Sequence, residues 1–121
     1  MNIRLAQHTD LEAINTIYNQ AVDARYCTAD LDRISFKERE LWFDIHSEDK
    51  YSVYVGVVDG EVVACFSFSA WRSGRRALAM SSEVSYYIHD KHFQKGYANK
   101  LMDFAINKAP ELGFKNLFAI L

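Results

Sequence analysis

The start of the chain has the polar and apolar spacing of one short strand followed by an amphipathic helix. Residues 3–5 alternate as in a strand, and apolar residues then recur at intervals of three and four from Leu11 to Ala21. Thr9 stands three residues before Glu12, which is the spacing of a capping box. The pattern predicts a helix that begins there and packs one apolar face on a sheet.

A second helix is indicated further along the chain. Ser35 and Glu38 repeat the capping-box spacing ahead of an apolar set made up of Leu41, Trp42 and Ile45. Between the two helices, residues 23–33 (DARYCTADLDR) have no clean period. We expect this segment to be a long loop.

The signal changes to that of strands at Tyr51. The runs YSVYVGVV and EVVACFSFSA are rich in β-branched and aromatic residues, and the hairpin dipeptide Asp59-Gly60 joins them. After an interruption at residues 71–80, SSEVSYYI resumes the strand pattern at residues 81–88. The sequence thus predicts an antiparallel hairpin and a further strand.

The remaining residues predict a helix and a last strand. Residues 98–109 have one apolar helical face, formed by Leu101, Met102, Ala105, Ile106 and Ala109. Pro110 should bend or end this helix, Gly113 suits a left-handed residue beyond it, and FKNLFAIL should form a buried strand. The order of elements predicts an α/β fold with a mixed sheet flanked by helices, in which the last two strands are parallel.

Composition narrows the class of protein. At 121 residues, with half of them apolar, the chain fits one domain spanning residues 1–121. A net charge of −2 without a basic block makes nucleic acid an unexpected partner. No apolar stretch approaches the roughly 20 residues that span a bilayer, so we expect no membrane contact and a cytoplasmic location. Cys27 and Cys65 lie far apart in the sequence, which favours free thiols.

The segment HFQKGYANKLM, residues 92–102, lies where a strand gives way to a helix. A helix N-terminus presents unpaired backbone N–H groups and a partial positive charge, so a turn without bulky side chains there can hold a phosphate or diphosphate. Gly96 and Ala98 would allow close approach to the backbone, and Lys95 or Lys100 could add charge. A glycine at such a turn is also often a backbone requirement alone, so the spacing leaves both interpretations open.

A longer stretch is more specific. SSEVSYYIHDKHFQKGYANKLM resembles motif A of the GCN5-related N-acetyltransferase (GNAT) family, in which a central strand precedes an Arg/Gln-x-x-Gly-x-Gly/Ala loop that opens a helix. Residues 3–22, 58–77 and 113–121 are similar to the phosphinothricin acetyltransferase branch, so the resemblance covers nearly the whole chain. It implies the GNAT fold and acetyl transfer to the primary amine of a small amino-acid-like molecule, of the phosphinothricin or methionine-derivative type.

The resemblance also implies a cofactor site. Acetyl-CoA would be the acetyl donor, with its pantetheine arm paired with the strand at Tyr86, Tyr87 and Ile88. Its diphosphate would lie on the backbone amides of Phe93, Gln94, Lys95, Gly96, Tyr97, Ala98 and Asn99. The family's first loop residue, Arg or Gln, falls on Phe93, and Gln94 is one place late; backbone donors survive this departure, but side-chain help is reduced.

The family pattern continues beyond Leu121, through elements that carry groups holding the pantetheine and assisting the thiolate. The resemblance therefore predicts a GNAT domain that is C-terminally incomplete, or one that borrows a strand from a partner. An uncovered strand edge would favour a homodimer. A non-catalytic CoA-binding or interaction protein is the alternative function.

Acetyl transfer from a thioester needs a neutral amine, a polarised carbonyl and a protonated leaving thiolate. Glu83 stands at the head of an apolar strand, aligned with Ser85 and Tyr87 by the two-residue period. The resemblance gives Glu83 the role of general base, directly or through water; the alternative is a solvated glutamate at a sheet edge. A backbone N–H freed near residues 86–88 could polarise the thioester carbonyl.

Three arginines precede Glu83 in an expected loop, namely Arg72, Arg75 and Arg76. A guanidinium can bind a carboxylate through two parallel hydrogen bonds. Arg75 is similar in position to a basic residue of the related branch, so we expect it to bind the substrate. A solvated loop is the alternative.

Two further residue sets carry weaker signals. His89 and His92 have HxxH spacing, but no third ligand is evident, so we expect no metal site. Tyr18, Trp42 and Trp71 could line a substrate cleft, although aromatic residues at such spacings more often belong to the core.

Overall fold

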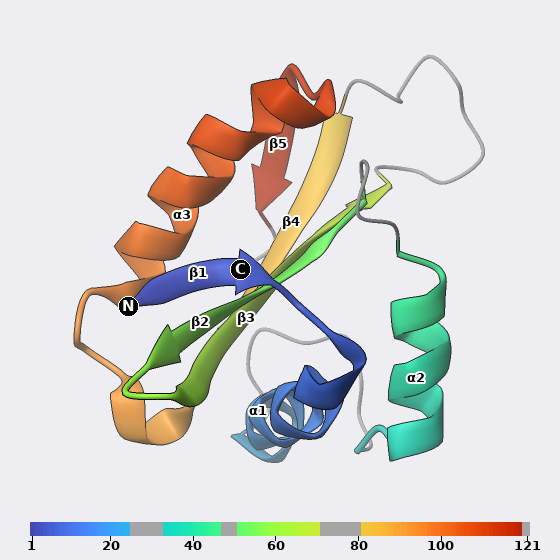
Figure 1. The fold of residues 1–121 in the computed structure, drawn as a ribbon, viewed down its shortest axis with the longest axis vertical. Coiled ribbons are helices and arrows are strands. Elements are labelled where there is room, and N and C mark those ends of the chain that lie inside the picture. Colours follow the sequence, from blue (N-terminus) through green and yellow to red (C-terminus); the bar gives the residue numbers. More distant parts are fainter. Residues whose placement is uncertain (25–32, 47–50, 71–80, 120–121) are drawn as a thin grey trace.

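The computed structural model describes residues 1–24, 33–46, 51–70 and 81–119. They form one sheet with helices on both of its faces (Figure 1). The strands are β1 (Asn2–Leu5), β2 (Val53–Val58), β3 (Glu61–Ala70), β4 (Ser81–Ile88) and β5 (Asn116–Ala119). The helices are α1 (Leu11–Ala24), α2 (Phe36–Asp44) and α3 (Tyr97–Lys108), with short 3₁₀ turns at His8–Asp10, Asp90–His92 and Ala109–Leu112.

The strands lie in the sheet in their order along the chain, from β1 to β5. Neighbours from β1 to β4 pair antiparallel, whereas β4 and β5 pair parallel. The parallel pair is connected through α3, because a chain must cross back along the sheet before it can run in the same direction again. The predicted mixed sheet flanked by helices is therefore confirmed.

The β2–β3 hairpin turns at Asp59 and Gly60, as predicted. Both residues have positive φ, 51° and 80°. A type I′ turn requires positive φ at both central residues, because its twist then matches that of the two strands.

The predicted cap of α2, Ser35, is confirmed. The predicted cap of α1, Thr9, is wrong, because Thr9 lies inside a 3₁₀ turn that precedes the helix and is capped by Gln7. The backbone N–H of Glu38 donates to Ser35 Oγ at 3.2 Å, and that of Ser35 donates to Glu38 Oε1 at 3.3 Å, which completes a capping box. Ahead of α1, the backbone N–H of Gln7 donates to the Asp10 carboxylate at 2.8 Å. The chain therefore turns before Thr9, and Thr9 is not the cap.

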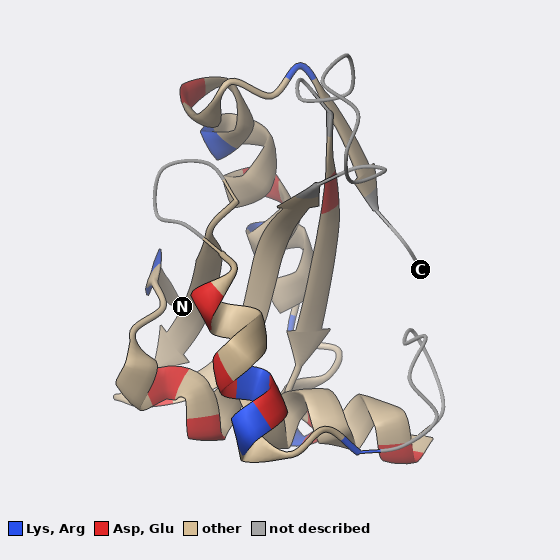
Figure 2. Ribbon diagram, turned by 90° about the vertical axis from the view of Figure 1, so that its right-hand side faces the viewer, with Lys and Arg blue, Asp and Glu red and all other residues tan. Residues whose placement is uncertain are grey.

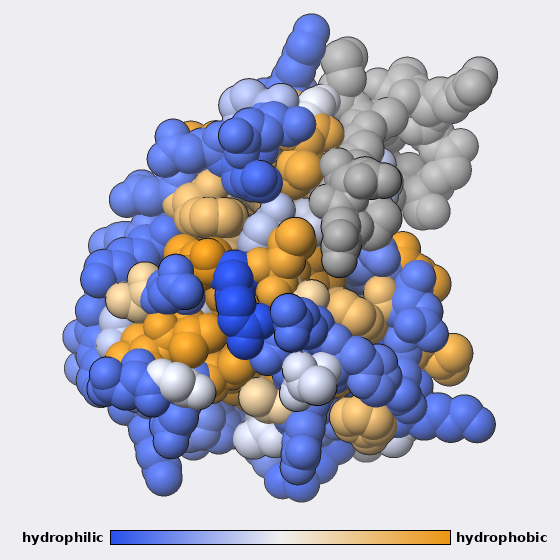
Figure 3. Space-filling model, viewed as in Figure 1, coloured by the Kyte–Doolittle hydropathy of each residue, from blue (hydrophilic) through white to orange (hydrophobic). Residues whose placement is uncertain are grey.

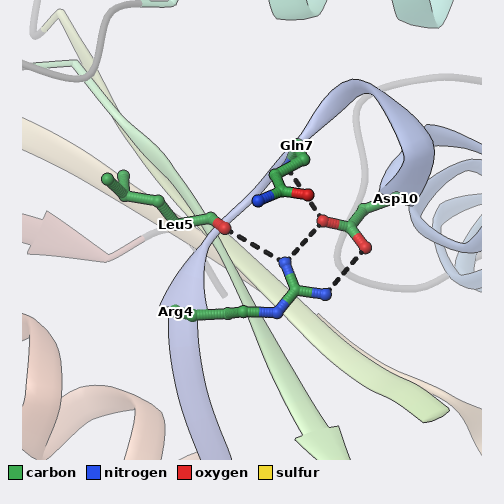
Figure 4. A network of polar contacts seen from close by, with 4 residues as sticks. All are labelled: Arg4, Leu5, Gln7 and Asp10. Atoms are coloured by element: carbon green, nitrogen blue, oxygen red, sulfur yellow. Dashed lines mark hydrogen bonds and ion pairs between the residues drawn. The ribbon is translucent and has the colours of Figure 1, made fainter. Parts of the chain in front are cut away.

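Asp10 is held in this position by Arg4 of β1 (Figure 4). The Nη1 and Nη2 atoms of Arg4 donate to the two carboxylate oxygens of Asp10 at 2.7 and 3.0 Å, which is a bidentate pair. Hydrogen bonding from Arg4 holds the pKa of the Asp10 carboxyl below its usual range, against the effect of burial. This ion pair ties the first strand to the first helix.

Replacing Asp10 by Asn should lower the free energy of unfolding by about 2 kcal/mol, because hydrogen bonds to a charged group are lost. A carboxylate with a depressed pKa stabilises the fold above its unfolded pKa, near 3.8, and loses that effect as the pH falls further. Urea denaturation should therefore show a difference between wild type and variant that shrinks below about pH 4. Asp23→Asn, at an exposed pair with Arg33, is the matched control and should cost clearly less, because water screens an exposed ion pair. Equal losses in the two variants would contradict the special role of Asp10.

Of the three apolar residues that indicated the second helix, Trp42 packs on the core and the other two are exposed. Leu41 and Ile45 are 60% and 77% exposed, while Arg39 is 3% exposed. The helix has 9 residues, and it turns the side that carries Arg39 and Trp42 toward α1. A stacked guanidinium therefore takes the place that an apolar residue would occupy.

The apolar face predicted for α3 is correct in part. Leu101, Ala105 and Ala109 are buried, at intervals of four residues, but Ile106 is 59% exposed. Ile106 follows Ala105 directly, and a step of one residue rotates a side chain about 100° around the helix. The face that meets the sheet is thus narrower than predicted.

The end of α3 follows the prediction. Pro110 lies in the 3₁₀ turn after the helix, and Gly113 has a φ of 87°. β5 then pairs parallel with β4, but Phe118 is 41% exposed, so the strand predicted as buried is a partly exposed edge strand.

Two apolar clusters hold the helices on the sheet. One lies between the sheet and α3 and includes Phe66 and Leu101, and the other lies between the sheet and α1 and includes Ile14 and Cys65. Successive residues of β3 thus serve opposite faces. Figure 3 shows apolar side chains reaching the surface beside α3 and β1, surrounded by hydrophilic residues. The cluster on the α1 side lies against a cavity.

Candidate active site

The loop that opens α3 has the backbone expected of a ligand-binding turn. Gly96 is the N-cap residue with a φ of 78°, and Gln94 also has a positive φ, 63°. A Cβ atom added at Gly96 would meet nothing within 4 Å. The glycine is therefore needed for its conformation, and the space above it is open.

The beginning of α3 offers donors and positive charge. The first backbone N–H groups of a helix have no acceptor within the helix, and they carry a partial positive charge. Lys95 is exposed, with its Nζ 3.4 Å from His92 Nδ1, and Lys100 Nζ lies 5.8 Å from the centroid of the Tyr97 ring. Both lysines stand where they could approach an anion on this turn.

β4 continues past the last described pair with β5. The two strands are paired from Ser81 to Val84 of β4, whereas β4 runs to Ile88 and stays paired with β3 along that length. Among the described residues, Tyr86–Ile88 thus have a strand partner on the β3 side alone. This stretch leads directly into the α3 loop, so the two predicted cofactor segments are neighbours.

A cavity of about 210 Å³ lies between the sheet and the first two helices. Its wall of helix and loop residues includes Tyr18, Arg39 and Trp42. Its floor comes from the sheet, and the polar members of that floor are Cys65, Ser67, Ser69 and Ser85. Tyr18 and Trp42, which the sequence left between cleft and core, therefore line a cavity; Trp71 lies outside the described residues.

Glu83 is not among the residues that line this cavity, but it lies next to two of them in the sheet. It is paired with Ser69 across β3 and β4, and both Ser69 and Ser85 line the cavity. Because alternate residues of a strand share a face, Glu83 lies on the same face as Ser85 and Tyr87, as predicted. It is the one charged residue in β4, and Figure 2 shows the strands almost without charge. A carboxylate is thereby placed beside a polar floor.

Arg39 was not singled out from the sequence. Its guanidinium carbon lies 4.5 Å from the centroid of the Tyr18 ring and 4.6 Å from that of Trp42, which is the geometry of cation–π stacking. Its Nε donates to Asn15 Oδ1 at 3.3 Å. The signal that could have found it is its spacing of three residues from Trp42, which places both on one side of α2.

His46 is the second residue that the sequence analysis missed. Its Nδ1 lies 2.8 Å from the carbonyl oxygen of Trp42, and its Nε2 lies 3.4 Å from Ser69 Oγ. Burial lowers the pKa of His46, the contact with Trp42 opposes this, and the charge of Arg39 adds to the lowering. A neutral ring with its proton on Nδ1 fits this arrangement, because a carbonyl oxygen can only accept a hydrogen bond and Nδ1 must therefore donate it.

The half-buried His46 should make the fold sensitive to mild acid. With a folded pKa below the ordinary 6.5, the unfolded state binds more protons below pH 6.5, so stability should fall as the pH drops through that value. His46→Gln should flatten the dependence of unfolding free energy on pH between about 7 and 5, by at most about 1.4 kcal/mol per pH unit. Chemical denaturation at half-unit pH steps measures this. Parallel curves for variant and wild type would contradict it.

Cys65 is a buried free thiol, as predicted. Burial raises its pKa to about 12, and the charge of Arg39 opposes part of that rise. A thiol with so high a pKa is not a nucleophile near neutral pH. Cys27, predicted with it, lies outside the described residues.

Other predicted residues lie apart from this cavity or outside the described chain. Arg72, Arg75 and Arg76 fall within residues 71–80, which the structure does not describe. The ring centroids of His89 and His92 are 5.9 Å apart, and His89 Nε2 lies 3.1 Å from Gln20 Nε2.

Within residues 1–24, 33–46, 51–70 and 81–119, no group of three potential metal ligands is found. Nor is any helix in that part of the chain long and apolar enough to cross a membrane. The cytoplasmic location stays a prediction of the sequence.

Comparison with known proteins identifies the family to which this chain belongs. The model of the acetyltransferase (GNAT) family matches residues 11–120. This chain belongs to that family. Across all of its 121 residues it is 36% identical to YwnH of Bacillus subtilis, which is named as a phosphinothricin acetyltransferase, and it spans 74% of that protein. It is 32% identical to the L-methionine sulfoximine/L-methionine sulfone acetyltransferase of Salmonella typhimurium, with 93% of this chain and 66% of that enzyme covered.

A solved GNAT structure supports the same assignment. The chain superposes with a TM-score of 0.91 on a phosphinothricin acetyltransferase from Sinorhizobium meliloti in complex with acetyl-CoA, at 27% identity, covering 98% of this chain and 64% of that one. The predicted GNAT fold and the resemblance to the phosphinothricin acetyltransferase branch are confirmed. The assignments of individual site residues stay predictions.

Proposed function

We propose that this GNAT domain, residues 1–121, transfers an acetyl group from acetyl-CoA to the primary amine of a small amino-acid-like acceptor, with Glu83 as general base. The observation that carries the proposal is the position of Glu83 between two features of β4. On one side is a polar cavity suited to an acceptor, and further along the strand is a stretch beyond the described β4–β5 pairs that leads into the Gly96 loop. Donor and acceptor would meet at β4.

The backbone fits acetyl-CoA. Amides from Phe93 to Asn99 would hold the diphosphate, because the left-handed Gln94 and Gly96 shape a turn in front of the α3 N-terminus. Tyr86–Ile88 would pair with the pantetheine arm, since peptide-like groups can add alongside a strand, and the described pairing of β4 with β5 runs from Ser81 to Val84. When bound, acetyl-CoA supplies the thioester carbonyl that is attacked.

Glu83 would supply the proton chemistry. An ammonium group cannot attack a carbonyl, so Glu83 takes one proton from the acceptor, directly or through a water molecule. The amine nitrogen then forms a bond to the acetyl carbon as the carbon–sulfur bond breaks. The proton that the acetylated nitrogen loses is passed to the leaving thiolate, so that the products are the amide and the CoA thiol. A backbone N–H near residues 86–88 would polarise the thioester carbonyl.

The names of the relatives indicate the acceptor class. YwnH is named for phosphinothricin and the Salmonella enzyme for methionine sulfoximine and methionine sulfone, all of which are amino-acid-like amines. A cavity of about 210 Å³ with serine hydroxyls on its floor fits a small polar molecule of this kind. Arg75, in the segment before β4, would also bind the substrate, and a homodimer is part of the same proposal.

Incubation of the chain with acetyl-CoA and L-methionine sulfone tests the function. We expect CoA thiol release that depends on the amine, and a product 42 mass units heavier, as one acetyl group replaces one hydrogen. Omitting the amine gives the background hydrolysis. Binding of acetyl-CoA without amine-dependent release would instead favour a non-catalytic CoA-binding protein.

A further inference from the structure

The cavity has one strongly polarising group. Of the described residues that line it, Arg39 alone carries a charge, and its side chain is among the most buried polar groups described. Burial of a guanidinium is costly unless other groups compensate for its lost hydration. A cation retained in the wall of an otherwise neutral cavity suggests a binding role for an anion.

We infer that Arg39 binds the carboxylate of the acceptor amino acid, opposite the amine that is directed to Glu83. The inference deepens the proposed function, because it assigns the acid-recognition subsite to a residue of α2. It does not depend on Arg75 or on any other residue of the loop at 71–80.

The guanidinium is fixed in place before any ligand arrives. The rings of Tyr18 and Trp42 lie at 4.5 and 4.6 Å, so its plane is confined between two elements, α1 and α2. Asn15 accepts from Nε at 3.3 Å, and its own Nδ2 donates to the carbonyl oxygen of Ile34 at 2.9 Å. A preorganised fork loses little side-chain entropy when it pairs with a carboxylate.

The charge of Arg39 is felt inside the cavity. Burial is the main influence on both neighbouring titratable groups, lowering the pKa of His46 and raising that of the Cys65 thiol. The positive charge of Arg39 adds to the lowering at His46 and opposes the rise at Cys65. Because Cys65 lines the floor of the cavity, an anionic group would meet a positive potential there.

The chemistry of the acceptor identifies which group is anionic. In methionine sulfone the side chain is uncharged and the amine must be neutral when it attacks, which leaves the carboxylate as the one anion. Glu83 lies next to the lining of the cavity with a negative charge, and Arg39 lines it with a positive one. A zwitterionic amino acid is therefore favoured with its ammonium group toward Glu83 and its carboxylate toward Arg39.

The test is a binding measurement that does not need turnover. Isothermal titration compares L-methionine sulfone with its primary carboxamide, which has the same shape but no negative charge. Wild type should bind the acid at least about 30-fold more tightly, and Arg39→Gln should bring the ratio close to one by weakening acid binding alone, since a buried charge-assisted pair is lost. Arg39→Lys keeps the charge without the fork and should retain part of the preference.

Arg33→Gln is the matched control. Arg33 lies exposed in an ion pair with Asp23, outside the residues that line the cavity, so its loss should leave the acid-to-amide ratio unchanged. A merely structural Arg39 would weaken both ligands equally when replaced. Thermal melting of each variant identifies unfolding, and if Arg39→Gln is unfolded the Arg39→Lys variant and the wild-type ratio carry the test.

Three outcomes would overturn the inference: no binding of the acid to wild type, no preference of wild type for acid over amide, or an unchanged preference in a folded Arg39 variant. The proposed function fails separately. Acid-selective binding that depends on Arg39, together with no acetyl transfer by wild type, would leave the carboxylate subsite in place and remove the enzyme assignment.

Discussion

Glu83→Gln is expected to lower the rate of acetyl transfer by about 10²- to 10⁴-fold, with acetyl-CoA affinity unchanged, because positioned general bases contribute factors of this size. Glutamine has nearly the same shape as glutamate but cannot accept the proton of an ammonium group. Glu83 lies next to residues that line the acceptor cavity and does not belong to the α3 loop, so donor binding should not sense the change. Steady-state CoA release with saturating acetyl-CoA gives the rate, and titration calorimetry gives the affinity.

The pH profile distinguishes a base from a structural glutamate. The Glu83→Gln variant depends on amine that has already lost its proton in solution, so its rate should rise about tenfold per pH unit below the pKa of the acceptor, a steeper rise than in wild type. Glu61→Gln in β3 is the control, since Glu61 is an exposed strand glutamate outside the lining of the cavity. A variant with wild-type rate, or with a uniformly lowered rate and an unchanged profile, would reject the base.

Sequence patterns predicted a turn or a helix start correctly where residues close together in the chain determine the local structure. The Asp59-Gly60 turn follows from backbone conformation alone, and the Ser35 cap follows from hydrogen bonds within four residues. Thr9 had the same spacing, but Arg4 of β1 holds Asp10 and moves the turn. That pair is a tertiary contact, which spacing along one helix does not report.

The same distinction separates the predicted from the missed site residues. Glu83 and Gly96 were predicted as site residues from the alternation of a strand, the turn at a helix N-terminus and the resemblance to the family motif. Arg39 was missed because its burial depends on Tyr18, in a different helix, while the apolar residues Leu41 and Ile45 of its own helix are exposed. Charged residues count as solvent-facing in sequence patterns, so spacing alone does not identify a stacked arginine as buried.

Gly96→Trp should abolish detectable acetyl-CoA binding, with an affinity loss of at least about 100-fold, or about 2.7 kcal/mol. The added side chain has two effects, one on the binding of acetyl-CoA and one on the stability of the fold. A side chain at Gly96 would fill the open space above the turn, and it would keep a diphosphate from approaching the backbone N–H groups at the start of α3. The φ of 78° also strains any residue with a Cβ atom there, which costs about 1 to 2 kcal/mol of stability.

Gly60→Trp separates the loss of binding from the strain. Gly60 has nearly the same backbone, with a φ of 80°, and it also has nothing within 4 Å of an added Cβ atom, but it lies in the β2–β3 turn. Both variants should lose similar stability in thermal melts, and the Gly96 variant alone should lose acetyl-CoA in calorimetry. Equal binding by the two would place the diphosphate elsewhere and reduce Gly96 to a conformational requirement of the strand-to-helix turn. Loss of binding confined to Gly96 would mean that the backbone of this turn holds the donor, which is the arrangement that allows Phe93 to stand where a polar residue begins the loop in the family motif.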